Sequence, residues 1–335
     1  MSVHLDSSTF TQRRNAAEDS EDHAGLVVPH SVGLNVWYHA LRPFSYPASI
    51  VPVLVGSAVA WYSGHVNWIL FVFALLGSVA IHAGTNLANE YFDYTQGVDK
   101  PDSLGPAGVI LEGKLRPKQV LQAAVLAFAL GAALGAYIVI QVGFVVLALG
   151  LVSILAGWFY TAKPLSLGYR GLGEPEVFIF MGPVMVMASY YVQARSFALP
   201  PLLVSLPVGF LVTAILHAND QRDVVQDMER SRVTWVVLAC RLWGMKRGKN
   251  FSCWVYYGML ACAYVTAIGL VVGGIAPPLT LLTLLTLPQA YRLIRFVASG
   301  VEGKPLSRVV RGTALLHMTF GATLTLGYFL SILIG

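Results

Sequence analysis

The chain has 335 residues, of which 56% are hydrophobic and only 12% are charged. Soluble domains carry about 25% charged residues, so this balance and the mean hydropathy of +0.65 exclude an ordinary soluble protein. The formal net charge of +5 does not require a nucleic-acid partner, because basic loops beside membrane helices give the same excess. The composition predicts an integral membrane protein in contact with the lipid bilayer and without nucleic acid.

The chain begins with a polar segment of mixed charge, residues 1–36, which contains no continuous apolar stretch. It lacks the pattern of a cleaved secretory signal, and its acidic residues argue against a transit peptide. We predict a disordered cytoplasmic tail over residues 1–36 and one membrane domain over residues 37–335.

From Ala40 onward, apolar segments of membrane-spanning length follow one another closely. They predict an all-α fold, a multi-pass membrane bundle of about nine transmembrane helices. The segments are 43–62, 67–92, 118–138, 141–160, 175–193, 200–219, 251–273, 276–297 and 312–334. Very short uncharged turns near residues 138–141 and 273–276 predict that the helices on either side are antiparallel neighbours.

The basic residues between the spans predict the orientation of the bundle. One set of loops holds nearly all of these lysines and arginines, whereas the opposite set holds essentially Arg195 alone. Basic loops stay in the cytoplasm, so we predict a multi-pass protein of the cell membrane with its N-terminus inside.

Polar residues recur on one face of the second predicted span, at helical spacings of four, three and four: His82, Asn86, Asn89 and Asp93. Such a stripe is costly in a membrane unless it faces a cavity or a partner. Asp93 also lies at a helix C-terminus, where the helix dipole is already negative. We therefore expect Asp93 to bind a cation.

A second apolar span ends in the same way, with Asn219, Asp223 and Asp227 recurring every four residues. An even number of predicted spans separates the two motifs, which predicts parallel repeats with both motifs on the cytoplasmic face. Proton-coupled carriers also place carboxylates in membrane helices, usually near the midplane. These carboxylates lie at the rim beside basic loops, which favours a headgroup or diphosphate site.

The acidic residues at these ends, Asp93, Asp223 and Asp227, with Asp99 just beyond, supply the hard oxygen ligands that Mg²⁺ takes together with phosphate and water. We predict Mg²⁺ and a phosphorylated ligand between the two ends. Lys163, Arg170 and Arg222 are candidates to contact the phosphate oxygens. Ordinary positive-inside charge explains each of these basic residues equally well.

Four segments resemble the UbiA superfamily of intramembrane prenyltransferases, over nearly the whole chain from about residue 36. They are 86–99 (NLANEYFDYTQGVD), 160–174 (YTAKPLSLGYRGLGE), 190–193 (YYVQ) and 219–227 (NDQRDVVQD). The LGYxGLGE part makes the chain most similar to the 1,4-dihydroxy-2-naphthoate prenyltransferase (MenA) branch of menaquinone and phylloquinone synthesis.

This resemblance implies nine helices around a central cavity that is open sideways to lipid. It implies that Asp93, Asp223 and Asp227 are the catalytic carboxylates and, with Asp99, hold Mg²⁺ and the diphosphate. Together with the residues themselves, it leads us to predict six substrate-binding residues: Asn89, Lys163, Arg222, Asn219, Arg170 and Tyr160. The chain departs from the family pattern at Gly105-Pro106, which lacks the usual flanking arginines, and at 231–235 (SRVTW), where Gly-x-x-Thr-Leu is common.

The implied reaction is Mg²⁺-dependent transfer of a polyprenyl group from a polyprenyl diphosphate to an aromatic acceptor, 1,4-dihydroxy-2-naphthoate. Homogentisate, a geranylgeranylglyceryl phosphate or a chlorophyllide is an alternative acceptor. A cation-coupled membrane carrier on a similar bundle is the alternative from another functional class.

Overall fold

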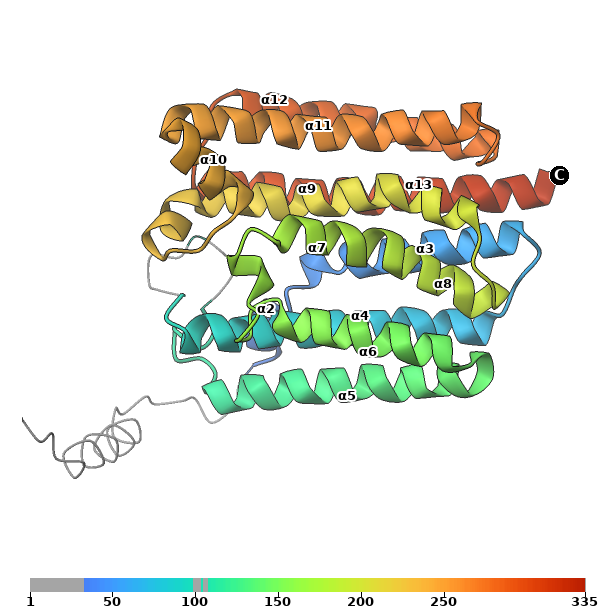
Figure 1. Cartoon of the computed structure of the whole chain (residues 1–335), viewed down its shortest axis with the longest axis horizontal. Helices are drawn as coiled ribbons and strands as arrows, with labels where there is room; N and C mark the ends of the chain where they lie inside the picture. Colours follow the sequence, from blue (N-terminus) through green and yellow to red (C-terminus); the bar gives the residue numbers. More distant parts are fainter. Residues whose placement is uncertain (1–32, 99–103, 105–107, 335) are drawn as a thin grey trace, which may run out of the picture.

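The computed structural model describes residues 33–98, 104 and 108–334. Within these ranges the chain is helical, with no β-structure beyond one isolated bridge, which confirms the predicted all-α class. The long helices run side by side along the longest axis of the molecule (Figure 1). Most of the predicted tail and the candidate ligand Asp99 lie outside the described residues.

The first half of the bundle contains five helices. They are α2 (Leu34–Leu41), α3 (Pro47–Tyr62), α4 (Trp68–Thr95), α5 (Pro117–Val142) and α6 (Phe144–Phe159). The segments Leu34–Ser45 and Pro47–Tyr62 meet at a bend of 48°. Helix α4 begins where the Asn67 side chain accepts a hydrogen bond from the Leu70 backbone N–H at 3.0 Å, which satisfies one of the unpaired donors of the first turn.

The second half begins with a broken span: α7 (Gly173–Ile179), a π-helical segment (Phe180–Val184) and α8 (Met185–Ala194). Pro183 lies inside the π-helical segment, and proline cannot donate the regular helical hydrogen bond. The remaining helices are α9 (Leu199–Glu229), α10 (Trp235–Trp243), α11 (Met245–Val272), α12 (Leu287–Ala298) and α13 (Ser307–Ile334).

Residues 276–297 form two elements rather than the single helix that hydropathy predicts. A 3₁₀ segment, Pro278–Thr286, precedes α12. The hydroxyls of Thr280, Thr283 and Thr286 each donate to the carbonyl three residues earlier, at 2.7, 3.0 and 2.6 Å. A 3₁₀ helix has the same three-residue repeat, so these threonines stabilise the tighter winding.

Six helices of the described ranges are long and apolar enough to cross a membrane, or seven if the bent pair counts as one span. The predicted count of nine is therefore not confirmed, although every predicted segment is mainly helical. Helix α6 has 16 residues, whereas a hydrocarbon core needs about 20. The 3₁₀ segment similarly shortens the eighth predicted span.

The main core lies between α3, α8, α9, α11 and α13, where Tyr256, Phe320 and Leu211 are fully buried. Helices α3 and α8 approach each other closely at Gly56. A Cβ at this position would lie 2.3 Å from the Val186 carbonyl oxygen. Small residues allow such close backbone contact, which drives helix association in lipid.

Helices α4 and α9, which carry the two acidic motifs, run in the same direction and end on the left side of Figure 1. The loops that follow α6 and α9 lie at this same end. The fold therefore brings both motifs to one end of the bundle, where the sequence places most of the basic loops.

Candidate active site

A cavity of about 440 Å³ lies between α4, α6, the α7–α8 span and α9. Most of its lining is apolar. The acidic residues that line it are Asp93, Glu176, Asp223 and Asp227. Both acidic helix ends therefore contribute to a single cavity in an otherwise apolar bundle.

The loop after α6 covers the end of α4. The Tyr169 hydroxyl donates a hydrogen bond to Asp93. The Thr161 hydroxyl donates to the Asn89 side-chain oxygen at 2.9 Å, and the Gln96 amide donates to the Thr161 carbonyl at 3.0 Å. These contacts fix the first acidic motif against the loop.

Glu90 lies in the same motif but has a structural role. It is 1% exposed, and Arg42 pairs with it at 2.8 Å. Its other oxygen accepts from the backbone N–H groups of Gly108 and Val109 at 2.9 and 3.0 Å. Glu90 is thus fully occupied in joining α4 to the segments before and after it.

At the end of α9, Arg222 forms a two-pronged contact with Asp223, at 2.8 Å from Nε and 2.6 Å from Nη2. Nη2 also donates to the Asn219 side-chain oxygen at 2.7 Å. Paired hydrogen bonds of this kind are strong and fix geometry. Arg222 therefore orients Asp223 along the cavity wall and neutralises part of its charge.

Arg232, just beyond α9, lies among three carboxylates. Its Nη1 is 3.5 Å from Asp227 Oδ1 and its Nη2 is 3.9 Å from Asp220 Oδ1, while Asp93 acts on it electrostatically. Burial lowers the pKa of the Arg232 guanidinium, but the carboxylates outweigh burial and raise that pKa well above its ordinary value. Arg232 therefore stays a cation at the centre of the site.

Two loops place Tyr169 and Arg232 over the helix ends. The Gly171 N–H donates to the Val233 carbonyl at 2.8 Å, and the Val233 N–H donates to the Tyr169 carbonyl at 3.0 Å. The Arg232 guanidinium lies 5.3 Å from the centre of the Tyr169 ring, within range of a cation–π contact. Sequence reasoning missed both residues as site residues, because this pairing joins loops far apart in the chain.

The donor atoms of the site fit Mg²⁺. Asp227 Oδ2 is buried and has no hydrogen-bond partner, and leaving a carboxylate oxygen in this state is costly unless a cation reaches it. Over the described ranges no three His, Cys, Asp or Glu side chains form a preformed metal cage. Mg²⁺ usually takes only one or two protein carboxylates and fills its remaining positions with phosphate and water.

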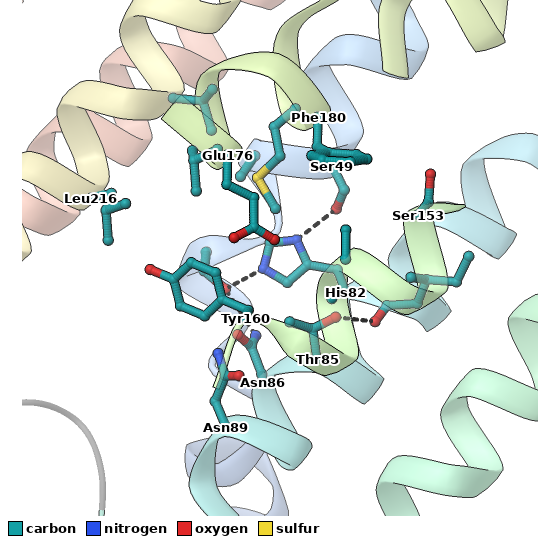
Figure 2. Close-up of a pocket in the computed structure, with 18 of the residues that line it drawn as sticks. Ser49, His82, Thr85, Asn86, Asn89, Ser153, Tyr160, Glu176, Phe180 and Leu216 are labelled. Atoms are coloured by element: carbon teal, nitrogen blue, oxygen red, sulfur yellow. Dashed lines mark hydrogen bonds between the residues drawn. The ribbon is translucent and has the colours of Figure 1, made fainter. Parts of the chain in front are cut away.

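A second polar region lies in the part of the cavity near His82 (Figure 2). The His82 ring nitrogens lie 3.0 Å from the hydroxyls of Ser45 and Ser49. The Asn86 amide also donates to the Ser45 hydroxyl at 3.0 Å. The Glu176 carboxylate, from α7, points toward His82 (Figure 2).

The structure separates the predicted substrate-binding residues into two groups. Four line the cavity: Asn89, Tyr160, Asn219 and Arg222. Lys163 and Arg170 are exposed and do not line it, and the Arg170 guanidinium instead donates to the Pro164 carbonyl at 2.7 Å. The roles of all six residues stay predictions.

Known proteins are similar in sequence to this chain over most of its length. The profile of the UbiA prenyltransferase family matches residues 49–330. The chain is 31% identical over 304 residues to the 1,4-dihydroxy-2-naphthoate octaprenyltransferase of Bacillus subtilis (strain 168), covering 90% of this chain and 94% of that protein. It is 34% identical over 285 residues to the protein of the same name from Mycobacterium tuberculosis (strain ATCC 25618 / H37Rv), covering 85% and 93%.

Two solved structures share the fold. The apo structure of a UbiA homolog from Aeropyrum pernix K1 superposes with a TM-score of 0.64 at 15% identity, covering 87% of this chain and 98% of that one. A UbiA homolog from Archaeoglobus fulgidus bound to DMAPP and Mg²⁺ gives a TM-score of 0.54 at 16% identity, covering 86% and 98%. The chain belongs to the UbiA prenyltransferase family.

Proposed function

We propose that this enzyme transfers a polyprenyl group from a polyprenyl diphosphate to 1,4-dihydroxy-2-naphthoate, a step of menaquinone biosynthesis. The observation that carries the proposal is the meeting of two acidic helix ends, α4 and α9, on one mainly apolar cavity. Residues 37–335 act as a single prenyltransferase domain, and residues 1–36 form a cytoplasmic tail.

The choice of acceptor is supported by the names of related proteins. The relatives from Bacillus subtilis and Mycobacterium tuberculosis are both 1,4-dihydroxy-2-naphthoate octaprenyltransferases. Each match covers more than nine-tenths of the relative's length. A shared acceptor is therefore the simplest assignment for this chain.

Asp93, Asp223 and Asp227 are the residues that would hold Mg²⁺, and Asp99 would join them. Bound Mg²⁺ supplies Lewis-acid stabilisation of the charge that develops on the departing diphosphate. The carboxylates by themselves would repel a diphosphate. Arg222 and Arg232, which already neutralise them, would offer N–H donors to its oxygens.

The rest of the cavity protects the reactive group. Its apolar lining keeps water away from the developing allylic cation, which water would otherwise capture. Tyr160 lines the cavity near Asn89 (Figure 2), and its aromatic face can stabilise a cation by a cation–π contact. The electron-rich acceptor ring then captures the allylic carbon, with loss of the carboxylate in the naphthoate case.

We place the active site on the cytoplasmic side of the cell membrane. The acidic helix ends lie at the same end of the bundle as most of the basic loops, and basic loops remain cytoplasmic.

Substitution of the acidic ends tests the proposal. Asp93→Asn and Asp223→Asn should each reduce Mg²⁺-dependent transfer at least 100-fold, because each removes a charged ligand while keeping the side-chain shape. Transfer is measured with radiolabelled geranyl diphosphate and 1,4-dihydroxy-2-naphthoate in proteoliposomes. Glu302→Gln, an exposed change of the same kind, is the matched control. Near-normal turnover of either Asn variant would contradict the metal assignment.

A panel of acceptors run with the wild-type enzyme tests the substrate. We expect 1,4-dihydroxy-2-naphthoate to be prenylated faster than homogentisate, geranylgeranylglyceryl phosphate or a chlorophyllide. Preference for one of the others would replace the acceptor while keeping the reaction.

A further inference from the structure

Glu176 differs from the other acidic residues of the cavity. Asp93 accepts from Tyr169, Asp223 is held by Arg222, and Asp227 faces Arg232. Within the described ranges, the Glu176 carboxylate has neither a hydrogen bond nor an ion pair, and its Oε2 is buried. A buried acceptor without a donor is costly, so its presence here points to a ligand that supplies the donor.

The local fold directs Glu176 into the cavity. Its neighbour Glu174 is 1% exposed and lies 3.4 Å from the buried His217, so that carboxylate is used inside the bundle. Glu176 instead lines the cavity. The π-helical segment after α7 packs against α9, where a Cβ on Gly182 would lie 2.8 Å from the Gly209 Cα. Single-turn π segments occur frequently at functional sites.

The facing wall is polar but already occupied. Both ring nitrogens of His82 lie within hydrogen-bond distance of serine hydroxyls. These hydroxyls in turn lie 2.8 Å from the Arg42 carbonyl and 3.2 Å from the Tyr46 carbonyl. Both His82 nitrogens are therefore already paired, whereas no described residue donates a hydrogen bond to the Glu176 carboxylate beside it (Figure 2).

The part of the cavity near His82 and Glu176 lies at a distance from Asp93 that suits an acceptor ring. A helix rises 1.5 Å per residue, so the seven residues from Asn86 to Asp93 extend roughly 10 Å along α4. A diphosphate held at Asp93 would therefore direct its allylic carbon toward Asn89 and Asn86. An aromatic ring that receives this carbon would lie in the part of the cavity that His82 and Glu176 line.

We propose that Glu176 is the catalytic base that binds and deprotonates a ring hydroxyl of the aromatic acceptor. This inference rests on the proposed function. The side chain is placed to accept a hydrogen bond from the hydroxyl before reaction and its proton during reaction. The acceptor class is therefore a hydroxylated aromatic compound whose hydroxyl lies next to the carbon that is prenylated.

The proton and electron balance follows from this placement. The acceptor O–H bond breaks, the proton moves to Glu176, and the oxygen forms a C=O bond. The ring carbon forms a C–C bond to the allylic carbon, whose bond to the diphosphate oxygen breaks with the electron pair leaving on the diphosphate. Where that ring carbon carries a carboxylate, CO₂ leaves, its bonding pair restores the aromatic ring, and the oxygen recovers the proton from Glu176.

The test compares wild-type enzyme with Glu176→Gln, Glu176→Asp and the exposed control Glu302→Gln. Glu176→Gln should lower kcat/KM for 1,4-dihydroxy-2-naphthoate by about 100-fold or more, the usual contribution of a general base. The affinity of Glu176→Gln for geranyl S-thiolodiphosphate, a probe whose allylic C–S bond does not ionise, should stay within twofold of that of wild type. The difference in kcat/KM between wild type and Glu176→Gln should become smaller as the pH rises, because the acceptor hydroxyl then ionises in solution and needs no base. Glu176→Asp should retain part of the activity.

The outcomes separate this inference from the proposed function. If wild type turns over and Glu176→Gln matches it at all pH values, the base assignment is wrong while the proposed function stands. Loss of probe affinity in Glu176→Gln, or a deficit that does not change with pH, would indicate a structural role and also overturn the assignment. If wild type prenylates no hydroxylated aromatic acceptor, both proposals fail.

Discussion

At the scale of single residues, the charge balance of the site depends on Arg232. It faces Asp227 and Asp220 at 3.5 and 3.9 Å, and both carboxylates are almost completely buried. Removing one partner of a buried ion pair is more destabilising than the pair is stabilising, because the remaining charge stays desolvated. Arg232 therefore holds the acidic end of α9 together.

Arg232→Gln should lower the free energy of unfolding by about 3 kcal/mol. This value is near the lower end for a broken buried ion pair, because the distances from Arg232 to Asp227 and Asp220 are long. In detergent with EDTA the Tm of this variant should fall below that of wild type, as measured by circular dichroism. Mg²⁺ should raise the Tm of the variant more than that of wild type, since the ion replaces the lost cation. Arg292→Gln, at an exposed position on α12, is the control. An equal Mg²⁺ response in both proteins would contradict this account.

At the scale of elements, close packing between helices drives their association, because lipid tails are as apolar as the side chains that the helices bury. At the α3–α8 crossing, a Cβ on Gly56 would lie 2.3 Å from the Val186 carbonyl oxygen and 2.7 Å from the Ser189 Cβ. None of these atoms is the end of a flexible side chain, so the helices must separate to accept even one methyl group. This crossing lies beside the cavity, which Ser189 lines.

Gly56→Ala should therefore lower stability by about 1–3 kcal/mol, the usual cost of overpacking. The same change at Gly258 on α11 is a matched control, because nothing lies within 4 Å of a Cβ built there. Ala is the better helix former by about 1 kcal/mol, so Gly258→Ala should be neutral or stabilising. Thermal unfolding in detergent measures both variants, and an equal effect would show that packing at Gly56 is unimportant.

At the scale of the whole molecule, the direction of the helices places both acidic motifs at one end of the bundle. The loop between α3 and α4 and the loop between α8 and α9 lie at the opposite end from the acidic motifs (Figure 1). The basic residues between the helices gather at the acidic end. The bundle thus has a basic face that holds the acidic site and a nearly uncharged opposite face.

Cysteine labelling tests this orientation in spheroplasts. In a background without Cys240, Cys253 and Cys262, a membrane-impermeant maleimide should label His65→Cys in intact spheroplasts. It should label Lys163→Cys only after permeabilisation, because we propose that this loop faces the cytoplasm. Both positions are exposed, so accessibility depends on sidedness. The reverse pattern would place the site on the outer face.

Hydropathy predicted the positions of the helices, and the acidic motifs were conspicuous because membrane helices rarely contain carboxylates. The contacts of Tyr169 and Arg232 could not be predicted, because a pairing between distant loops leaves no local periodic pattern. The position of Glu176 in the cavity could not be predicted either, because the helix dipole alone favours an acidic residue in the first turn of a helix. The 3₁₀ winding before α12 depends on threonine hydroxyls, which hydropathy does not weigh.

The shortness of α6 has a consequence for the surrounding lipid. Sixteen residues extend about 24 Å, whereas the hydrocarbon layer is about 30 Å thick. None of its residues is buried, and Leu149, Gly150 and Ser153 line the cavity. A span shorter than the hydrocarbon layer is accommodated by local thinning of the bilayer, by snorkelling of flanking residues or by oligomerisation. Thinning beside α6 would bring the headgroup region closer to the cavity. With the headgroup region nearer, an amphiphile with a long isoprenoid tail would have a shorter path from the leaflet to the cavity while its tail stays among acyl chains.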